Sequence, residues 1–140
     1  TLTQTVPPTP GQPVKQPMLI PVALGLVGPD GRDLPLTLAG ETAPGATTRV
    51  LALTGARQSF TFTDVPAKPV PSLFRGFSAP VKLRFGYSDG DLTFLMARDS
   101  DAFNRWEAGQ TLATRLILAL VEDRVAGREM AVPDAFIDAV

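Results

Sequence analysis

The sequence predicts a mainly β fold, in which an immunoglobulin-like antiparallel β-sandwich of about seven or eight strands is followed by a long α-helix. Thirteen of the fourteen Pro residues lie between Pro7 and Pro80, and Pro is excluded from helix interiors. Short segments with alternating apolar and polar residues recur in the same region, separated by turn residues at intervals of about 8 to 15 positions. The periodicity becomes helical at Asp101.

The N-terminal strands are expected at 1–6 and 18–27, where the alternation of residue types is regular. Every even position of 18–27 is large and apolar, which places these side chains on one face. The turn residues at 28–31 and the renewed alternation at 34–38 predict a hairpin. The Pro-rich stretch 7–13 is expected to be an extended connection across the sandwich.

The remaining strands are expected over 50–54, 59–64, 73–77, 81–87 and 92–97. The last two are expected to form a hairpin, because Asp89 and Gly90 supply a tight turn between them. Six Phe residues alternate with polar neighbours and are expected in the core: Phe60, Phe62, Phe74, Phe77, Phe85 and Phe94.

The C-terminal part predicts a helix of about 25 residues that begins at a cap formed by Ser100 or Asp101 and stops near Gly127. Trp106 is expected to be buried between this helix and the sandwich. The stretch 116–121 is apolar all round the helix, which is typical of a helix with neighbours on several sides. We therefore expect a sandwich domain over 1–98 and, over 99–140, the start of a larger helical domain.

The helical domain is expected to continue with a second helix over 134–140. We expect both ends of the sequence to lie within a longer protein.

Composition excludes several classes of function. Thirteen Lys and Arg against fourteen Asp and Glu give a net charge of −1, so the basic surface of a nucleic-acid-binding protein is missing. The absence of His and Cys excludes a structural zinc site, a His-ligated metal, a thiol nucleophile and a His-containing triad. The longest apolar run, 116–121, is too short to span a membrane. The sequence thus predicts no catalytic, metal-binding or substrate-binding residue.

Two polar groupings have alternative interpretations. Four Asp residues surround the last expected strand: Asp89, Asp91, Asp99 and Asp101. They predict a calcium site only weakly, because the spacing of a calcium loop is absent, and turn or helix-cap roles are favoured. Arg75 is interpreted as a surface or interdomain salt-bridge partner in preference to an anion site.

Several segments, in order and with matching spacing, resemble the bacterial alanyl aminopeptidase N family of zinc metallopeptidases. These segments are Thr5–Pro13, Lys15–Pro21, Pro69–Leu73, Phe77–Leu83, Leu92–Met96 and Phe103–Ala108. The resemblance implies an internal immunoglobulin-like domain between the catalytic domain and the C-terminal helical domain, together with the first helices of the latter. In this family the zinc ligands and the general base belong to the preceding catalytic domain, so no such residue is carried over to this sequence.

The resemblance further implies a cytoplasmic parent protein that removes N-terminal residues, Ala and others, from peptides. This chain would act as a spacer whose partners are the catalytic and helical domains of the same polypeptide, with no nucleic acid, membrane or cofactor of its own. In isolation it is expected to self-associate through Leu116, Ile117 and Leu120 or to leave them exposed. The alternatives are a free-standing ligand-binding or adhesion-type β-sandwich and an independent hydrolase that uses carboxylates.

Overall fold

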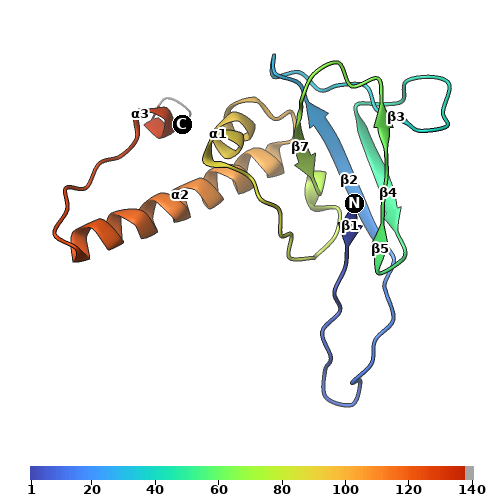
Figure 1. Ribbon diagram of the computed structural model, residues 1–140, viewed down its shortest axis with the longest axis horizontal. Helices are drawn as coiled ribbons and strands as arrows, with labels where there is room; N and C mark the ends of the chain where they lie inside the picture. Colours follow the sequence, from blue (N-terminus) through green and yellow to red (C-terminus); the bar gives the residue numbers. More distant parts are fainter. Residues whose placement is uncertain (138–140) are drawn as a thin grey trace.

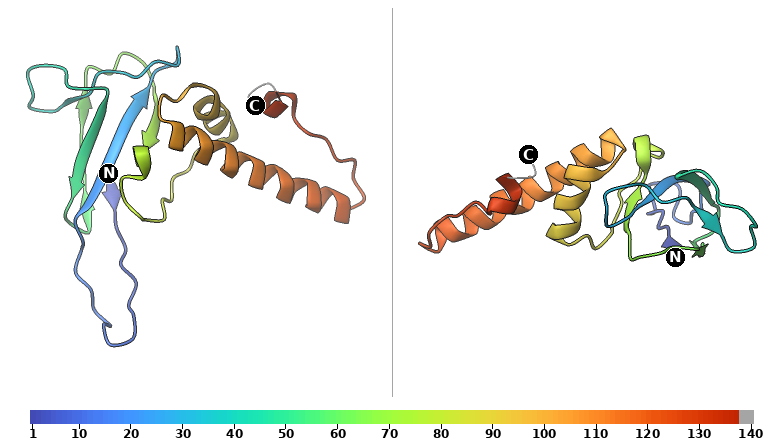
Figure 2. Two further views of the ribbon diagram at one scale, coloured as in Figure 1. Left: turned by 180° about the vertical axis from the view of Figure 1, so that it is seen from behind. Right: turned by 90° about the horizontal axis from the view of Figure 1, so that it is seen from above.

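The computed structural model describes residues 1–137 and consists of a strand-rich part and a helical part (Figure 1). The strands are β1 (Leu2–Thr3), β2 (Ile20–Val27), β3 (Thr37–Leu38), β4 (Thr48–Leu53), β5 (Arg57–Gln58), β6 (Phe62–Thr63) and β7 (Val70–Leu73). The helices are the 3₁₀-helix η1 (Arg75–Phe77) and the α-helices α1 (Asp89–Arg98), α2 (Ala102–Val125) and α3 (Asp134–Ile137). Helix α2 extends well away from the strands (Figure 2).

Strand β2 is the centre of the main sheet, whose order is β4-β2-β7 and whose pairs are antiparallel. Two further antiparallel pairs, β1-β5 and β3-β6, complete the β part. The N-terminal half of β2 pairs with β4 alone, which tolerates Pro21 and its missing N–H. There the hydroxyl of Ser78 accepts a hydrogen bond from the amide of Ala23 and donates one to the carbonyl of Pro21. The predicted fold class, an immunoglobulin-like β domain followed by helices, is confirmed.

Both faces of β2 are buried, each against a different core. The even residues Val22 and Leu24 lie in the sandwich core with Leu36, Leu51 and Leu53, as the alternation predicts. The odd residue Val27 belongs to a second core built mostly from the helices: Leu92, Leu95, Ala108 and Leu112. The alternation does not extend to Met18, which precedes β2 and is 59% exposed.

Of the hairpin predicted for 18–38, only the turn and the first bridge are present. Gly31 adopts a φ of 79° in the expected turn, and its amide donates to the carbonyl of Gly28. One bridge between Val27 and Asp33 follows, after which the chain leaves β2 and forms β3 beside β6. The hairpin lies on the edge of β2 opposite β7, and from Gly25 to Ile20 this edge is occupied by β4, so 34–38 cannot continue along β2.

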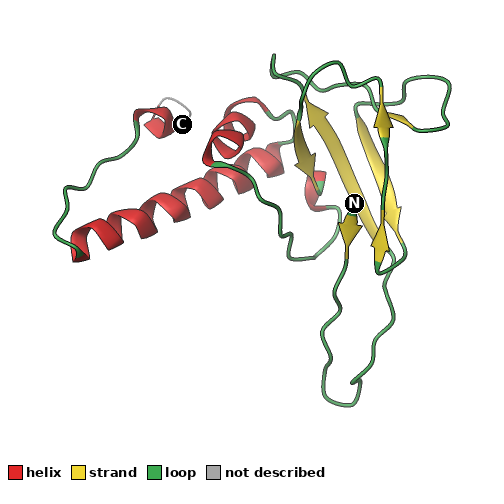
Figure 3. Cartoon of the chain, in the orientation of Figure 1, coloured by secondary structure: helices red, strands yellow, loops and turns green. Residues whose placement is uncertain are grey.

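The hairpin predicted for 81–87 and 92–97 is wrong. Residues 89–98 form helix α1, and 81–87 is a loop (Figure 3). Ser88 and Asp91 form a capping box: the amide of Asp91 donates to the Ser88 hydroxyl, and the amide of Ser88 donates to the Asp91 carboxylate. The expected turn residues therefore begin a helix, which buries Leu92 and Leu95 one turn apart.

Three aromatic residues expected in the interior lie at the surface: Phe77, Phe85 and Trp106 are 55%, 48% and 58% exposed. Phe77 is misplaced because 73–77 is not one strand, since β7 ends at Leu73 and η1 follows. Phe85 is exposed because its segment has no partner strand. The other four Phe residues assigned to the core are half-buried against the two cores: Phe60, Phe62, Phe74 and Phe94.

The long helix is confirmed. Helix α2 has 24 residues, and the Asp101 carboxylate accepts the amide of Asn104 at its N-terminus. Its second half presents Ile117, Leu118 and Val121 to solvent, each more than half exposed. Helix α3 agrees with the start of the predicted stretch 134–140, whose last three residues lie outside the described part. No helix within 1–137 is both long and apolar enough to cross a membrane.

Candidate functional site

The most developed polar site is the Arg75 cluster, which we define as Arg75 with Asp33, Thr48, Ser72 and Asp99. It lies where the main sheet meets the helices, and Arg75 itself is only 5% exposed. The turn after β2 supplies Asp33, β4 supplies Thr48, β7 supplies Ser72, and the α1–α2 junction supplies Asp99.

All five N–H donors of the Arg75 guanidinium are used. Nη1 and Nη2 donate to the two carboxylate oxygens of Asp33 at 2.9 and 2.7 Å, in a bidentate pair. Nε donates to the Ser72 hydroxyl at 2.9 Å, and Nη1 also donates to the Thr48 hydroxyl at 2.7 Å. The last donor of Nη2 reaches Oδ1 of Asp99 at 3.2 Å. One side chain thus connects four separate parts of the chain.

The backbone is shaped to hold this guanidinium. Gly25 of β2 lies beneath it, and a Cβ atom at position 25 would stand 2.1 Å from Cζ of Arg75. Phe74, which precedes η1, and Phe77, its last residue, adopt φ values of 57° and 54°, and Gly76 has a φ of 60°. Left-handed conformations are unfavourable for bulky residues and persist only where the surroundings enforce them.

Helix α2 is fastened to the same cluster through its first turn. The side-chain amide of Asn104 donates to the Ser72 hydroxyl at 2.7 Å and to the Leu73 carbonyl at 3.0 Å. The second carboxylate oxygen of Asp101 accepts the amide of Gly76 at 3.0 Å. Arg105 donates to the carbonyl of Asp99 at 2.8 Å. The helix cap is therefore also a contact between the helical part and η1.

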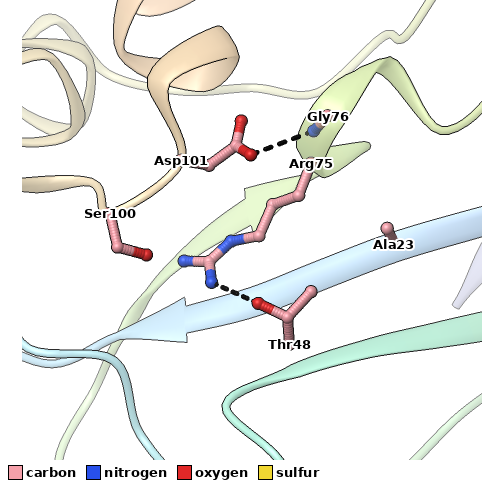
Figure 4. Close-up of a pocket in the computed structure, with 6 residues that line it drawn as sticks. All are labelled: Ala23, Thr48, Arg75, Gly76, Ser100 and Asp101. Atoms are coloured by element: carbon pink, nitrogen blue, oxygen red, sulfur yellow. Dashed lines mark hydrogen bonds between the residues drawn. The ribbon is translucent and has the colours of Figure 1, made fainter.

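A shallow pocket of about 360 Å³ opens beside the cluster. Its lining consists of Ala23, Thr48, Arg75, Gly76, Ser100 and Asp101. Figure 4 shows the guanidinium lying between Thr48 and Ser100 and its hydrogen bond to the Thr48 hydroxyl. An arginine whose donors are all used has none left for a bound anion, so the geometry favours a structural role.

The charges of the cluster are mutually stabilising. Burial acts to raise the pKa of Asp33, but hydrogen bonds from Arg75 and Ser100 and the charge of Arg75 outweigh it and hold the pKa below its ordinary value of 3.8. Burial acts to lower the pKa of Arg75, but the hydrogen bond from Arg75 to Asp33 and the charges of Asp99 and Asp33 outweigh it and raise the pKa above its ordinary value. Oδ2 of Asp99 is buried without a hydrogen-bond partner in the described residues, so Asp99 depends on Arg75 for charge compensation.

The four Asp residues considered for calcium do not come together as a site. Asp91 is part of the α1 capping box and Asp101 caps α2, whereas Asp89 pairs with Arg115 and Asp99 with Arg75. Within 1–137, no group of three or more potential metal ligands is present. The donor set also does not fit the zinc site implied by the family resemblance, because the whole chain has neither His nor Cys.

Residues 1–86 match the model of a family described as a domain of unknown function, DUF3458, with an Ig-like fold. The chain belongs to this family. Residues 88–140 match the model of a C-terminal companion described as ARM repeats. The two matches meet at the loop that precedes α1, so the DUF3458 fold accounts for the strands and its companion for the helices.

Relatives of this DUF3458 chain are aminopeptidases. It is 40% identical to aminopeptidase N of Escherichia coli over 139 residues, and 46% identical to aminopeptidase N of Caulobacter vibrioides over 96 residues. These alignments cover 99% and 69% of this chain. The crystal structure of Legionella pneumophila aminopeptidase A in complex with aspartic acid superimposes with a TM-score of 0.63 at 28% identity over 86% of this chain. The expected resemblance to aminopeptidase N is confirmed.

The chain spans only a small part of each relative: 16% of the E. coli protein, 10% of the Caulobacter protein and 12% of the Legionella chain. The chain therefore corresponds to a small part of aminopeptidase N and not to the complete enzyme.

Sequence reasoning identified Arg75 as a salt-bridge residue but missed the cluster around it. Asp33, Thr48 and Ser72 are ordinary turn and strand residues in the sequence, and each lies 3 to 42 positions from Arg75. Gly25 was the one available signal, because a Gly inside a strand often marks a close approach of another group.

Proposed function

We propose that this chain is a non-catalytic connecting segment of a zinc-dependent alanyl aminopeptidase, and that the longer protein hydrolyses N-terminal residues, Ala and others, from peptides. The observation that supports this most strongly is the alignment of 99% of the chain with 16% of E. coli aminopeptidase N. Because the chain lacks His and Cys, the zinc ligands must come from elsewhere in the polypeptide. The cofactor of the parent is zinc, and the chain itself binds none.

The role of the segment is to hold a helical domain at a set position relative to the catalytic domain. The second core supports this role, since Val27 of β2 packs with residues of α1 and α2. The Arg75 cluster adds directional bonds across the same junction. Apolar packing resists separation of the two parts, and a bidentate ion pair resists rotation between them. The partners of the segment are thus the catalytic and helical domains of its own polypeptide.

The division of the chain into two units is part of this proposal. The boundary expected from the sequence, at residue 98, rests on a strand over 92–97. Because 89–98 is instead a helix that packs on α2, we place the junction in the loop before α1, where the two family matches meet.

The exposed second half of α2 is proposed to be covered by further helices of the parent. A shallow pocket of about 260 Å³ lies there, lined by Ile117, Leu120, Val121, Arg124, Val125 and Met130. In the isolated chain we expect Leu116, Ile117 and Leu120 to mediate self-association or to remain exposed. Sedimentation velocity distinguishes the two: Ile117→Glu should shift a self-associating chain toward monomer, and a compact monomer in which hydrogen exchange finds 116–121 buried would contradict the expectation.

We also propose that the parent protein is cytoplasmic. The support is the family resemblance. Fractionation of cells that express the full-length parent tests it, and recovery of the peptidase in an exported fraction would overturn it.

The peptidase proposal is tested with the full-length parent and with this 140-residue chain. The parent should release the chromophore from alanine p-nitroanilide, contain zinc by elemental analysis and lose activity on chelation. The isolated chain should do none of these. A chelator-sensitive peptidase activity in the isolated chain would overturn the proposal, as would a purified parent with neither zinc nor activity.

One observation favours the alternative of a free-standing ligand-binding module. Phe77, Phe103 and Trp106 form an aromatic group with ring centroids 5.4 and 6.1 Å apart, and the first and last are more than half exposed. The rings are tilted by 52° and 40°, however, so they do not form the flat platform on which a sugar stacks. Trp106 is the single Trp of the chain, so a change in its fluorescence on titration with oligosaccharides would support this alternative.

A further inference from the structure

The loop over 81–87 has the sequence of a β-strand but no partner strand. Val81, Leu83, Phe85 and Tyr87 alternate with Lys82, Arg84 and Gly86, a pattern typical of a strand. In the structure these residues connect η1 to α1 as a loop on the outside of the molecule (Figure 3). We call this stretch the 81–87 segment.

The main chain of the 81–87 segment is largely unpaired. In the described part of the chain, two of its main-chain groups form hydrogen bonds: the Val81 amide donates to Ala79, and the Tyr87 carbonyl accepts from Arg115. A Cβ atom added at Gly86 would meet no atom within 4 Å, so the main chain there is open to a partner. A row of free N–H and C=O groups in a sequence of high β propensity is a template for an added strand.

The apolar side chains of the 81–87 segment point to the same use. Val81, Leu83 and Phe85 are 37%, 41% and 48% exposed. The ring centroids of Phe85 and Tyr87 lie 4.5 Å apart. Side chains two positions apart are neighbours in this way when they lie on the same side of an extended chain. An added strand would cover apolar area as well as main-chain groups.

Charge identifies the kind of strand that fits. No Asp or Glu occurs between Asp64 and Asp89, although the whole chain has a net charge of −1. Lys82 and Arg84 are exposed and belong to no ion pair in the described residues. A partner with acidic residues at alternate positions would face them, and opposite charges across a strand pair are stabilising.

A second copy of this chain is a poor partner by the same reasoning. In an antiparallel pair of two 81–87 segments centred on Leu83, Lys82 of one copy lies opposite Arg84 of the other. Like charges directly opposite each other destabilise a strand pair.

We propose that the 81–87 segment is a docking site for an acidic, extended strand contributed by the part of the parent polypeptide outside these 140 residues. This inference rests on the proposed function, since it requires that longer polypeptide. It adds to the spacer role a specific point at which the segment is anchored to the remainder of the protein.

Hydrogen–deuterium exchange in the full-length parent and in the 140-residue chain tests the proposal. The amides of 82–86 should exchange at least about tenfold more slowly in the parent, because paired amides are protected. The double variant Lys82→Glu/Arg84→Glu should restore fast exchange there. Lys15→Glu/Arg57→Glu makes the same charge change outside the segment and should leave the protection intact.

The partner itself is identified with benzoylphenylalanine in place of Phe85 in the full-length parent. Crosslinking to an acidic segment of the same polypeptide supports the proposal, whereas crosslinking to a second copy overturns it. Equally fast exchange in the parent and the isolated chain, or equally slow exchange in both, also overturns it. Zinc content and peptidase activity of the same preparation report separately on the proposed function, so the two proposals can fail independently.

Discussion

The guanidinium of Arg75 lies against the backbone of Gly25 so closely that any side chain at position 25 would collide with it. Gly25 lies in the C-terminal half of β2, and Arg75 is in the 3₁₀-helix η1 that follows β7. This contact lets a charged group pass over a buried strand and reach Asp33 and Asp99 beyond it. It ties the conformation of the sheet to that of the helices.

Arg75→Met should destabilise the chain by about 3–5 kcal/mol, because it leaves Asp33 and Asp99 without their buried partner. Urea unfolding followed by circular dichroism measures the loss. Arg57→Met is the matched control: Arg57 is exposed, and its replacement should change the stability by less than about 0.5 kcal/mol. Equal effects of the two substitutions would contradict the structural role of Arg75.

Gly25→Ala should cost about 1–3 kcal/mol, because the new methyl group displaces the guanidinium from its bonded position. Gly86→Ala introduces the same methyl group where no atom lies within 4 Å and should have little effect. The decisive measurement is a double-mutant cycle. In the Arg75→Ala background, the penalty of Gly25→Ala should shrink by about 0.5–3 kcal/mol, and strictly additive penalties would reject the contact.

Acid should weaken the cluster through Asp33. Burial acts to raise the pKa of this carboxyl, but the hydrogen bonds from Arg75 and Ser100 and the charge of Arg75 hold it below 3.8. A depressed pKa contributes stability that is present above the unfolded value and is lost as the pH falls through the folded value. Asp33→Asn should therefore flatten the decline in stability below about pH 3.8, as seen in urea unfolding at a series of pH values. An unchanged slope would show that Asp33 does not titrate with unfolding.

The capping box of α1 gives a direct test of the helix that replaces the predicted strand. Ser88→Ala should cost about 1 kcal/mol, since the amide of Asp91 loses its acceptor. Ser88→Asn retains an acceptor and should recover most of the stability. If both substitutions were neutral in thermal unfolding, the cap would contribute nothing measurable.

The parts of the fold that the sequence predicts well are those decided by local patterns. The alternation in β2, the turn at Gly31 and the capped, 24-residue helix α2 all agree with the structure. Each depends on residues within a few positions of one another, where side-chain period and backbone conformation determine the outcome.

The sequence misleads where one local pattern has two solutions. Ser88 to Asp91 fits a tight turn as well as a helix cap, and the helix forms because Leu92 and Leu95 then reach the core that contains Val27. Trp106, expected inside, lies on the face of α2 that this core does not use. Propensity is a weak guide when a distant partner decides which face is buried.

By itself, the sequence determined the immunoglobulin-like class, the capped helix and the lack of imidazole and thiol, because composition and period follow directly from the order of residues. The tertiary structure alone decided that Arg75 meets Asp33 and Asp99, 42 and 24 positions away, over the bare backbone of Gly25. A buried ion pair forms only where separate elements pack together and exclude water. That juxtaposition depends on how the elements assemble, which no local pattern encodes.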